Sequence, residues 1–487
     1  MAMASHSGVP RRKWWKIQWF SIDDTPEEKK FITKLDLVLV PYILVSYWVK
    51  NLDQNNLNNA YVGGMKEELG FYGNELIRLQ TMYIIGAVLG QIPFLFIFTY
   101  LPMYWLIPGM DILWGVATLL QFRAQSFAEM AAYRFLVGWF EQCHFALEPV
   151  IDKTIGSWYR GHEISRRGGV WYTGLPIGTL TAGLVQAGAT RGLEGVHGLS
   201  GWRWMYIICA IITIPVGIVG YFVIPGTIDK PNRYVLNDND LAIARQRLGK
   251  NGHKVQGKLK FHHIKKIMSS KHFWIVVFVD VLFWNAGINS GAFLLWLKSL
   301  KRYDSATVNE YGTIPPAAGI FFTLFANFSS DLLWGPVWAI TFASGMNTIT
   351  NLILTIWHVP ESAKWFAYCN YGWSFALSSV LHGWVNNMLR DSPEMRSFTL
   401  VFINIIAQSS TAWTGLLAYP TVQAPRFPRG YAFSLSMSTS LIVGAHLLNL
   451  YLKNRKDSKA IDPSHTSDGD DTDILERRAN VTLSQPF

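Results

Sequence analysis

One apolar stretch of the sequence carries ionisable side chains at a helical spacing. Arg134, Gly138, Glu141, Phe145 and Glu148 follow one another at intervals of four, three, four and three residues. At roughly 100° per residue they share a stripe about 80° wide on one helix face. Ionisable groups are costly inside a bilayer, so they are functional candidates there. The stripe predicts a cavity in which an arginine attracts an anion and a glutamate accepts a proton. The alternative is a structural charge network that holds helices together.

A second polar stripe interrupts the first apolar run of the chain. Tyr47, Asn51, Gln54 and Asn58 lie on one helix face. Amide and hydroxyl groups at this density cannot face lipid without cost, so we expect them to line the cavity or to pack on another polar helix. Lys50 lies about 60° from Tyr47 around the same helix. A place in the cavity and a place at the outer interface are both open for it.

The remaining candidates lie in three other apolar runs. Asp280 is a candidate inner gate or proton site, and a salt bridge to a loop arginine is equally compatible with its position. Asn404 and Gln408 are spaced by one helical turn, which is a modest signal for a cavity wall. His144 lies about 60° away from the stripe of Arg134 and is a weaker candidate for proton coupling.

These residues need a scaffold that crosses a membrane many times. Of the 487 residues, 50% are hydrophobic and 16% are charged, whereas soluble proteins carry about 25% charged residues. Twelve apolar runs approach the roughly 20 residues that a helix needs to cross the hydrocarbon layer. They are 35–60, 76–99, 104–122, 128–151, 169–188, 204–224, 273–297, 310–330, 335–357, 362–385, 398–419 and 430–452. The predicted fold is an all-α membrane protein with twelve transmembrane helices in two six-helix halves around a cavity. Gly86 and Gly90 predict close helix packing in the second span.

The polar segments between the spans predict the domains and the orientation. We expect an N-terminal tail (1–34), a first half (35–225), a linker (226–272), a second half (273–452) and a disordered C-terminal tail (453–487). Within the linker, Asn237 and Asp240 predict the capping box of a short helix. Of the 43 Lys and Arg residues, 30 fall in the tails, the linker and the loops 152–168 and 386–397. Positive charge marks cytoplasmic segments, so both termini are expected in the cytoplasm.

The composition also excludes several classes of function. The net charge of +10 gathers in loops and tails, so it reports topology and does not indicate nucleic-acid binding. The sequence has no Walker loop, no GxSxG motif and no paired histidine ligands, so we expect neither an enzyme nor a cofactor. Any uphill transport would then have to use an ion gradient. The expected partners are a small organic anion, protons and membrane lipid, and we expect a monomer.

Several motifs resemble those of a known family. They are Leu52-Asp53-Gln54-Asn55-Asn56, Gly90-Gln91-Ile92-Pro93, the run from Tyr133 to Glu141, Gly156-Ser157-Trp158-Tyr159 and Leu295-Trp296-Leu297-Lys298-Ser299-Leu300. From about Lys34 to Leu452 the chain resembles the fungal anion:cation symporters of the major facilitator superfamily, the group of allantoate and vitamin permeases. Within that group the first and last of these motifs look closest to the pantothenate and biotin permeases.

The resemblance implies proton-coupled import of a small organic anion at the plasma membrane, above all pantothenate, with biotin, nicotinate or allantoate as alternatives. A nutrient sensor that hardly transports is an alternative of another class. The resemblance also implies that Arg134 and Glu141 match the membrane-embedded arginine and glutamate of the wider family. Gln54 stands where many relatives carry arginine. We therefore expect Arg134 to be the main contact of the anion and Lys50 to compensate for Gln54.

Overall fold

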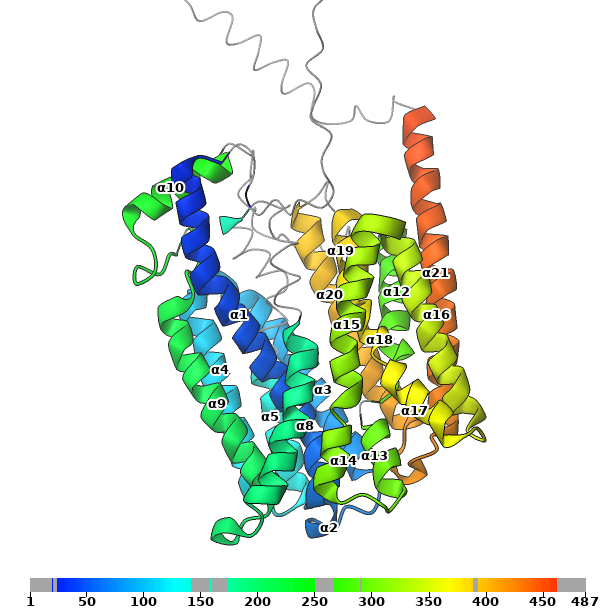
Figure 1. Ribbon diagram of the computed structural model, residues 1–487. Coiled ribbons are helices and arrows are strands. Elements are labelled where there is room, and N and C mark those ends of the chain that lie inside the picture. Colours follow the sequence, from blue (N-terminus) through cyan, green and yellow to red (C-terminus); the bar gives the residue numbers. More distant parts are fainter. Residues whose placement is uncertain are drawn as a thin grey trace, which may run out of the picture.

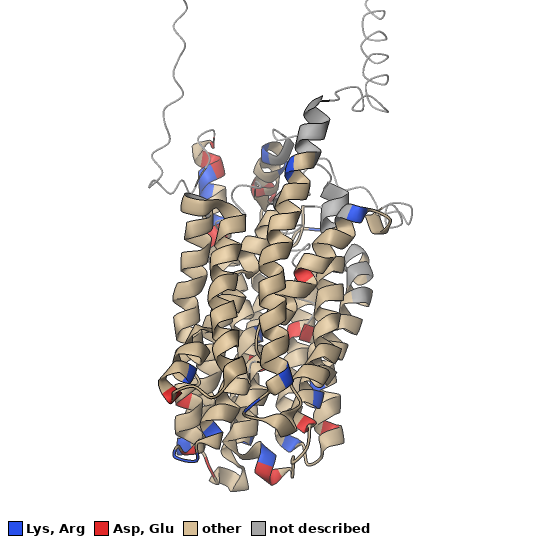
Figure 2. Ribbon diagram, turned by 90° about the vertical axis from the view of Figure 1, so that its right-hand side faces the viewer, with Lys and Arg blue, Asp and Glu red and all other residues tan. Residues whose placement is uncertain are grey.

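The computed structural model is helical throughout the part of the chain that it describes. That part comprises residues 20, 24–141, 158–159, 173–228, 230–249, 267–289, 291–388 and 393–461. The helices run side by side along one long axis and form two groups, α1 to α9 and α12 to α21 (Figure 1). Charged residues are concentrated towards the two ends of the molecule, and only a few lie in the middle (Figure 2). This distribution is the one expected of a protein that spans a membrane.

The first group holds the spans of the N-terminal half. Its helices are α1 (Pro26–Ala60), the short α2 (Lys66–Glu68), α3 (Glu75–Tyr100), α4 (Met103–Leu120), α5 (Phe127–Glu141), α8 (Gly174–Gly192) and α9 (Gly201–Val223). Helix α1 begins well before the predicted span because Thr25 and Glu28 form a capping box ahead of it. The end of the fourth predicted span and the start of the fifth lie outside the described residues.

The second group holds the spans of the C-terminal half. Its helices are α12 (Lys271–Ala286), α13 (Ala292–Ser299), α14 (Ser305–Tyr311), α15 (Ile314–Ser329), α16 (Gly335–Ile356), α17 (Glu361–Asn370), α18 (Trp373–Ala376), α19 (Ser378–Met388), α20 (Pro393–Ala418) and α21 (Pro428–Ile461). Within the described residues of the whole chain, six helices are individually long and apolar enough to cross a membrane.

Two predicted spans are broken, which corrects the continuous helices expected at 273–297 and 362–385. The first breaks between α12 and α13, and the second consists of α17, α18 and α19. At the first break, the carbonyl of Ala286 accepts a hydrogen bond from the Asn347 side chain at 2.9 Å, and that of Gly287 accepts one from the Ser434 hydroxyl at 2.8 Å. Irregular backbone is tolerated at membrane depth where protein groups satisfy it in this way.

Glycines bring α3 and α5 into close contact, as Gly86 and Gly90 predict. A Cβ atom on Gly86 would lie 2.2 Å from the carbonyl oxygen of Phe135, and one on Gly90 would lie 2.5 Å from that of Trp139. On the facing helix, a Cβ atom on Gly138 would lie 2.1 Å from the carbonyl oxygen of Tyr83. Only glycine fits at these positions, because the backbones themselves touch. The contact places Tyr83 beside the ionisable stripe of α5.

The two halves contact each other at one end of the molecule, opposite the end at which α1 begins and α21 ends. Lys298 on α13 donates to Glu67 on α2 at 2.7 Å, and Arg191 on α8 pairs with Glu310 on α14. In Figure 1, α2, α13 and α14 lie at the lower end, whereas α1 begins and α21 ends at the upper end. If both termini are cytoplasmic, these contacts close the outer side of the protein.

Helix α10 (Asp238–Gly249) packs against the first turns of α1. The predicted capping box is confirmed, since Asp240 N–H donates to the Asn237 side chain at 2.8 Å and Asn237 N–H donates to Asp240 at 3.1 Å. Asp240 also pairs with Lys34 at 2.7 Å. Arg247 lies 3.4 Å from Asp24, and both side chains are almost fully buried, at 1% and 0% exposure. The helix is therefore anchored to the N-terminal half.

Removing one partner of this buried pair is expected to destabilise the protein. Asp24→Ala removes a buried carboxylate that lies 3.4 Å from the guanidinium of Arg247, and breaking a buried ion pair typically costs about 3–5 kcal/mol. Thermal unfolding of the purified protein in detergent measures the loss. The matched control is Lys34→Ala, because Lys34 is 41% exposed and such pairs contribute at most about 1 kcal/mol. Equal losses in the two variants would contradict the larger contribution expected of the buried pair.

Candidate functional site

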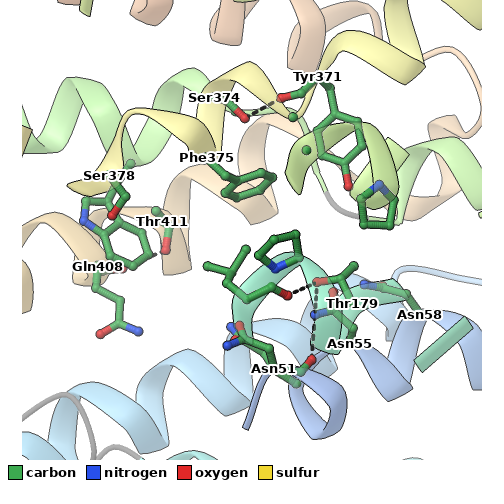
Figure 3. Close-up of a pocket in the computed structure, with 18 of the residues that line it drawn as sticks. Asn51, Asn55, Asn58, Thr179, Tyr371, Ser374, Phe375, Ser378, Gln408 and Thr411 are labelled. Atoms are coloured by element: carbon green, nitrogen blue, oxygen red, sulfur yellow. Dashed lines mark hydrogen bonds between the residues drawn. The ribbon is translucent and has the colours of Figure 1, made fainter. Parts of the chain in front are cut away.

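A cavity of about 340 Å³ lies between the two halves, within the range of roughly 300–1,000 Å³ that is usual for small-molecule sites. Side chains of α1, α3, α5 and α8 line one side, and those of α12, α15 and α18 to α20 line the other. In Figure 3, Asn51, Asn55 and Thr179 face Tyr371 and Phe375 across the open space. The wall from the first half is mainly polar and the opposite wall is rich in aromatic rings.

The polar stripe of α1 forms much of the first wall. Tyr47, Asn51, Gln54 and Asn58 all line the cavity, together with Asn55. Asn55 donates to the Thr179 hydroxyl of α8 at 3.1 Å, and Gln80 of α3 donates to Asn58 at 2.7 Å. These bonds hold the amides in fixed orientations, as a site for a polar ligand needs.

Arg134 brings a positive charge to this wall. Its side chain is 2% exposed and lines the cavity from α5. The guanidinium carbon lies 4.9 Å from the centre of the Tyr83 ring, in a cation–π contact. Among the described residues, Nε and Nη1 have no hydrogen-bond acceptor. Buried N–H donors without acceptors are costly. An anion in the cavity would supply the hydrogen-bond acceptors that the described residues do not provide.

Glu141 lies one layer behind the cavity wall. Its side chain is fully buried, and Oε1 accepts a hydrogen bond of 2.7 Å from the Tyr83 hydroxyl. Among the described residues, Oε2 has no donor. Tyr83 therefore touches Arg134 with its ring and Glu141 with its hydroxyl. Sequence reasoning missed Tyr83. The feature of the sequence that could have identified Tyr83 is its position one helical turn before Gly86, on the face of α3 that packs against α5.

Lys50 is buried inside the N-terminal half. It is 1% exposed, which makes the outer-interface alternative wrong. It does not line the cavity, so the structure does not bring it to the place expected for an auxiliary contact of the substrate. Its ammonium lies 5.7 Å from the centre of the Tyr47 ring, and its charge acts on Glu141. We therefore assign Lys50 to the charge network behind the wall.

Asp53 belongs to the same charge network as Lys50, Arg134 and Glu141. It was not predicted as a site residue. It is 1% exposed. It accepts hydrogen bonds from Trp114 at 2.6 Å and Thr213 at 2.9 Å, and from Asn56 at 3.3 Å. The charges that act on Glu141 are those of Lys50, Asp53 and Arg134. The four groups together carry two positive and two negative charges when all are ionised.

The predicted residues of the second half fall into two positions. Asn404 and Gln408 on α20 line the cavity, and Gln408 accepts a hydrogen bond of 2.8 Å from Gln91 of the first half. Asp280 is buried behind the wall, where its carboxyl lies 3.3 Å from His382 of α19. The carboxyl therefore faces a histidine within the membrane, and the alternative of a loop arginine is wrong. His144 lies outside the described residues.

The described residues offer no place for a metal. Among them, no group of three or more His, Cys, Asp or Glu side chains is arranged to hold an ion. The cavity instead presents the buried guanidinium of Arg134 on its wall, with the buried carboxyl of Glu141 behind that wall.

The chain is similar to proteins of one known family. Residues 43–415 match the profile of the Major Facilitator Superfamily. A vitamin H transporter of Saccharomyces cerevisiae is 36% identical over 87% of this chain and 73% of its own length. The pantothenate transporter liz1 of Schizosaccharomyces pombe is 31% identical over 83% of this chain and 78% of its own length.

Solved structures support the fold independently. A structure of the proton:xylose symporter XylE superposes with a TM-score of 0.64 at 15% identity, covering 85% of this chain and 95% of that protein. At 15% identity, this structural similarity supports the fold and nothing more specific. The helical membrane fold predicted from the sequence, with its two six-helix halves, is confirmed.

Proposed function

Because this chain belongs to the Major Facilitator Superfamily, we propose that it is a secondary transporter that imports a small vitamin monocarboxylate together with protons. The observation that carries the proposal is Arg134. This cation lines the central cavity, and two of its nitrogens find no acceptor among the described residues. A carboxylate in a low-dielectric cavity must meet a fixed positive charge or lose its hydration without compensation. The planar guanidinium matches a carboxylate with two parallel hydrogen bonds.

The charge balance of the buried groups requires that a proton binds together with the carboxylate. Lys50, Arg134, Asp53 and Glu141 are neutral as a set when all are ionised, so a bound carboxylate adds one uncompensated negative charge. Such a charge is expensive in a protein interior. Protonation of Glu141 restores neutrality, and Tyr83 links that carboxyl to Arg134. The proposal is therefore one proton for each carboxylate, carried inward by the proton gradient.

The walls favour an elongated substrate with polar groups along one side. The amides of Asn51, Asn55 and Asn58 can bond to an amide, ureido or hydroxyl group, and Phe375 and Tyr371 can cover an apolar portion. Pantothenate, the substrate that the sequence predicts, has this pattern. Biotin is the second candidate, because the vitamin H transporter has a higher identity to this chain than the pantothenate transporter liz1.

Uptake by proteoliposomes tests the function. We expect labelled pantothenate or biotin to accumulate against its concentration when a pH gradient, acid outside, is imposed, and the accumulation to vanish when an ionophore collapses the gradient. Competition between the two vitamins identifies the preferred one. Downhill equilibration without any response to the gradient would make the protein a uniporter. Binding without flux would favour a sensor.

The proposed place is the plasma membrane, with both tails in the cytoplasm. Epitopes inserted at Ser7 and at Ser467 are expected to stay hidden from antibodies on intact cells and to become accessible after permeabilisation, because positively charged segments remain inside. An epitope in the outer loop next to Val196, which is 38% exposed, is the matched control and is expected to be labelled on intact cells. Labelling of either tail without permeabilisation would overturn the orientation.

A further inference from the structure

Two side chains of the polar cavity wall, Asn55 on α1 and Thr179 on α8, are bonded to each other in a way that fixes what they can offer a ligand. Both line the cavity. The side-chain nitrogen of Asn55 donates to the backbone carbonyl oxygen of Asn51 at 2.8 Å and to the hydroxyl of Thr179 at 3.1 Å. A carboxamide nitrogen carries two hydrogens, so both are engaged. The oxygen Oδ1 is therefore the atom of this amide that can still bond to a ligand, and it can only accept.

Backbone carbonyls set the orientation of the Asn55 amide and the direction of the Thr179 hydroxyl hydrogen. Because the carbonyl of Asn51 only accepts hydrogen bonds, the nitrogen and not the oxygen of the Asn55 amide must face it. The Thr179 hydroxyl donates its single hydrogen to the carbonyl of Leu175 at 3.1 Å. Its oxygen can therefore accept from a ligand, but it cannot donate to one without losing this bond.

Hydroxyl groups on the opposite wall have the same polarity. Ser374 of α18 donates to the carbonyl of Tyr371 at 2.8 Å, and Thr323 of α15 donates to that of Gly319 at 2.8 Å. Both side chains line the cavity. Figure 3 shows Ser374 across the open space from the polar wall. Two walls of the cavity thus present hydroxyl oxygens whose hydrogens are already given to the backbone.

A ligand that brings hydrogen-bond donors fits this part of the cavity better than one that brings only acceptors. A donor can bond to these oxygens without breaking any bond within the protein. An acceptor would have to displace a backbone carbonyl or stay unpaired, and an unpaired polar group in a buried site is costly. Other helices offer donors, among them the guanidinium of Arg134 on α5 and the indole N–H of Trp284 on α12. The carboxylate and the donor-bearing part of a ligand would thus be recognised by different residues.

We propose that Asn55 and Thr179 form an acceptor subsite that binds an N–H or O–H group of the substrate and selects among monocarboxylates by that group. The inference rests on the proposed function in one respect, namely that the ligand is a carboxylate bound in this cavity. Biotin and allantoate supply such donors in their ureido groups, and pantothenate supplies them in its amide and hydroxyl groups. Nicotinate does not, because its ring nitrogen only accepts. The subsite determines specificity, whereas Arg134 binds the carboxylate that all these acids share.

Competition binding to the purified full chain tests the preference for donors. Biotin and lipoate carry the same pentanoate side chain, but lipoate has no N–H group. We expect lipoate to displace labelled biotin about tenfold or more less effectively than unlabelled biotin does. Desthiobiotin keeps the ureido N–H groups without the sulfur ring and is expected to compete nearly as well as biotin. If labelled pantothenate is the vitamin that binds, its dideoxy analogue replaces lipoate. Equal competition by the donor-free acid, or desthiobiotin as weak as lipoate, would overturn the subsite.

Variants of Thr179 assign the preference to the subsite. Thr179→Val removes one acceptor and frees an N–H of Asn55. We expect it to weaken binding of the vitamin about two- to tenfold and to leave binding of the donor-free acid unchanged, whereas Thr179→Ser keeps the wild-type ratio. The matched control is Thr181→Val, because the Thr181 hydroxyl accepts from Trp48 at 2.8 Å and does not line the cavity. An unchanged ratio in Thr179→Val, or an equal loss for both acids, would leave Thr179 a structural role and overturn the proposal.

Failure of the proposed function gives a different result. If neither vitamin binds to the wild-type protein, the proposed function fails. Thermal stabilisation of the same protein by a panel of carboxylates with and without N–H or O–H donors then decides the subsite. Stabilisation only by the donor-bearing members, reduced in Thr179→Val and retained in Thr181→Val, would support it. Stabilisation by none of them, or equally by the donor-free members, would overturn it.

Discussion

Glu141→Gln is expected to abolish pH-driven accumulation of the substrate and to preserve its exchange across the membrane. Glutamine keeps the size of the side chain, and its carbonyl oxygen can still accept from the Tyr83 hydroxyl, which lies 2.7 Å from Glu141. It cannot bind and release a proton. With residue 141 neutral, Lys50, Arg134 and Asp53 carry one net positive charge, and a bound carboxylate balances that charge without a proton. Binding and exchange therefore persist, and the link to the proton gradient is lost.

The measurement compares two assays on the same proteoliposomes, accumulation under an imposed pH gradient and counterflow without one. The matched control is Glu129→Gln, because Glu129 lies in the first turn of the same helix and is exposed. It is expected to behave as wild type in both assays. Full gradient-driven accumulation by Glu141→Gln would remove Glu141 from the coupling role. Loss of both activities in a correctly inserted protein would indicate a structural role instead.

Arg134→Lys is expected to weaken substrate binding by about ten- to a hundredfold, which corresponds to the loss of a charge-assisted hydrogen bond of about 1.5–3 kcal/mol. Lysine keeps the positive charge but replaces the planar fork by a single point of attachment. It also gives up the stacking of the guanidinium on Tyr83, at 4.9 Å. Binding to the purified protein, measured by scintillation proximity with the labelled vitamin, reads the effect directly.

Two further variants make the assignment of Arg134 specific. Arg191→Lys is the matched control, because Arg191 is 55% exposed and pairs with Glu310 away from the cavity. It is expected to bind as wild type. Lys50→Ala is expected to raise the apparent KM through the charge network, since Lys50 does not line the cavity. Wild-type binding by Arg134→Lys together with no binding by Lys50→Ala would reverse the two roles. Unchanged binding in both would place the anion elsewhere.

Helical spacing explains why part of the site was predictable. Hydrophobic length alone defines a membrane span, because a helix must cross a hydrocarbon layer of nearly constant thickness. Within a span, the period of the helix places Tyr47, Asn51, Gln54 and Asn58 on one face, and the structure places all four in the cavity wall. The same argument placed Arg134 and Glu141 on one face of α5. These inferences need only distances along one helix, and the sequence contains those distances.

The partners of each group were decided by the tertiary structure, because they come from other helices. Tyr83 reaches Glu141 only because Gly138 and Gly86 let α3 and α5 touch. His382 on α19 lies 3.3 Å from Asp280 on α12. The spacing of residues along the chain does not predict a contact between two different helices. Lys50 and Asn51 are adjacent in sequence, yet one is buried behind the wall and the other lines the cavity. The sequence by itself determined which residues are available for binding an anion and a proton. Packing between helices determined which of them face the cavity and which charges they meet there, because burial and pairing depend on every helix at once.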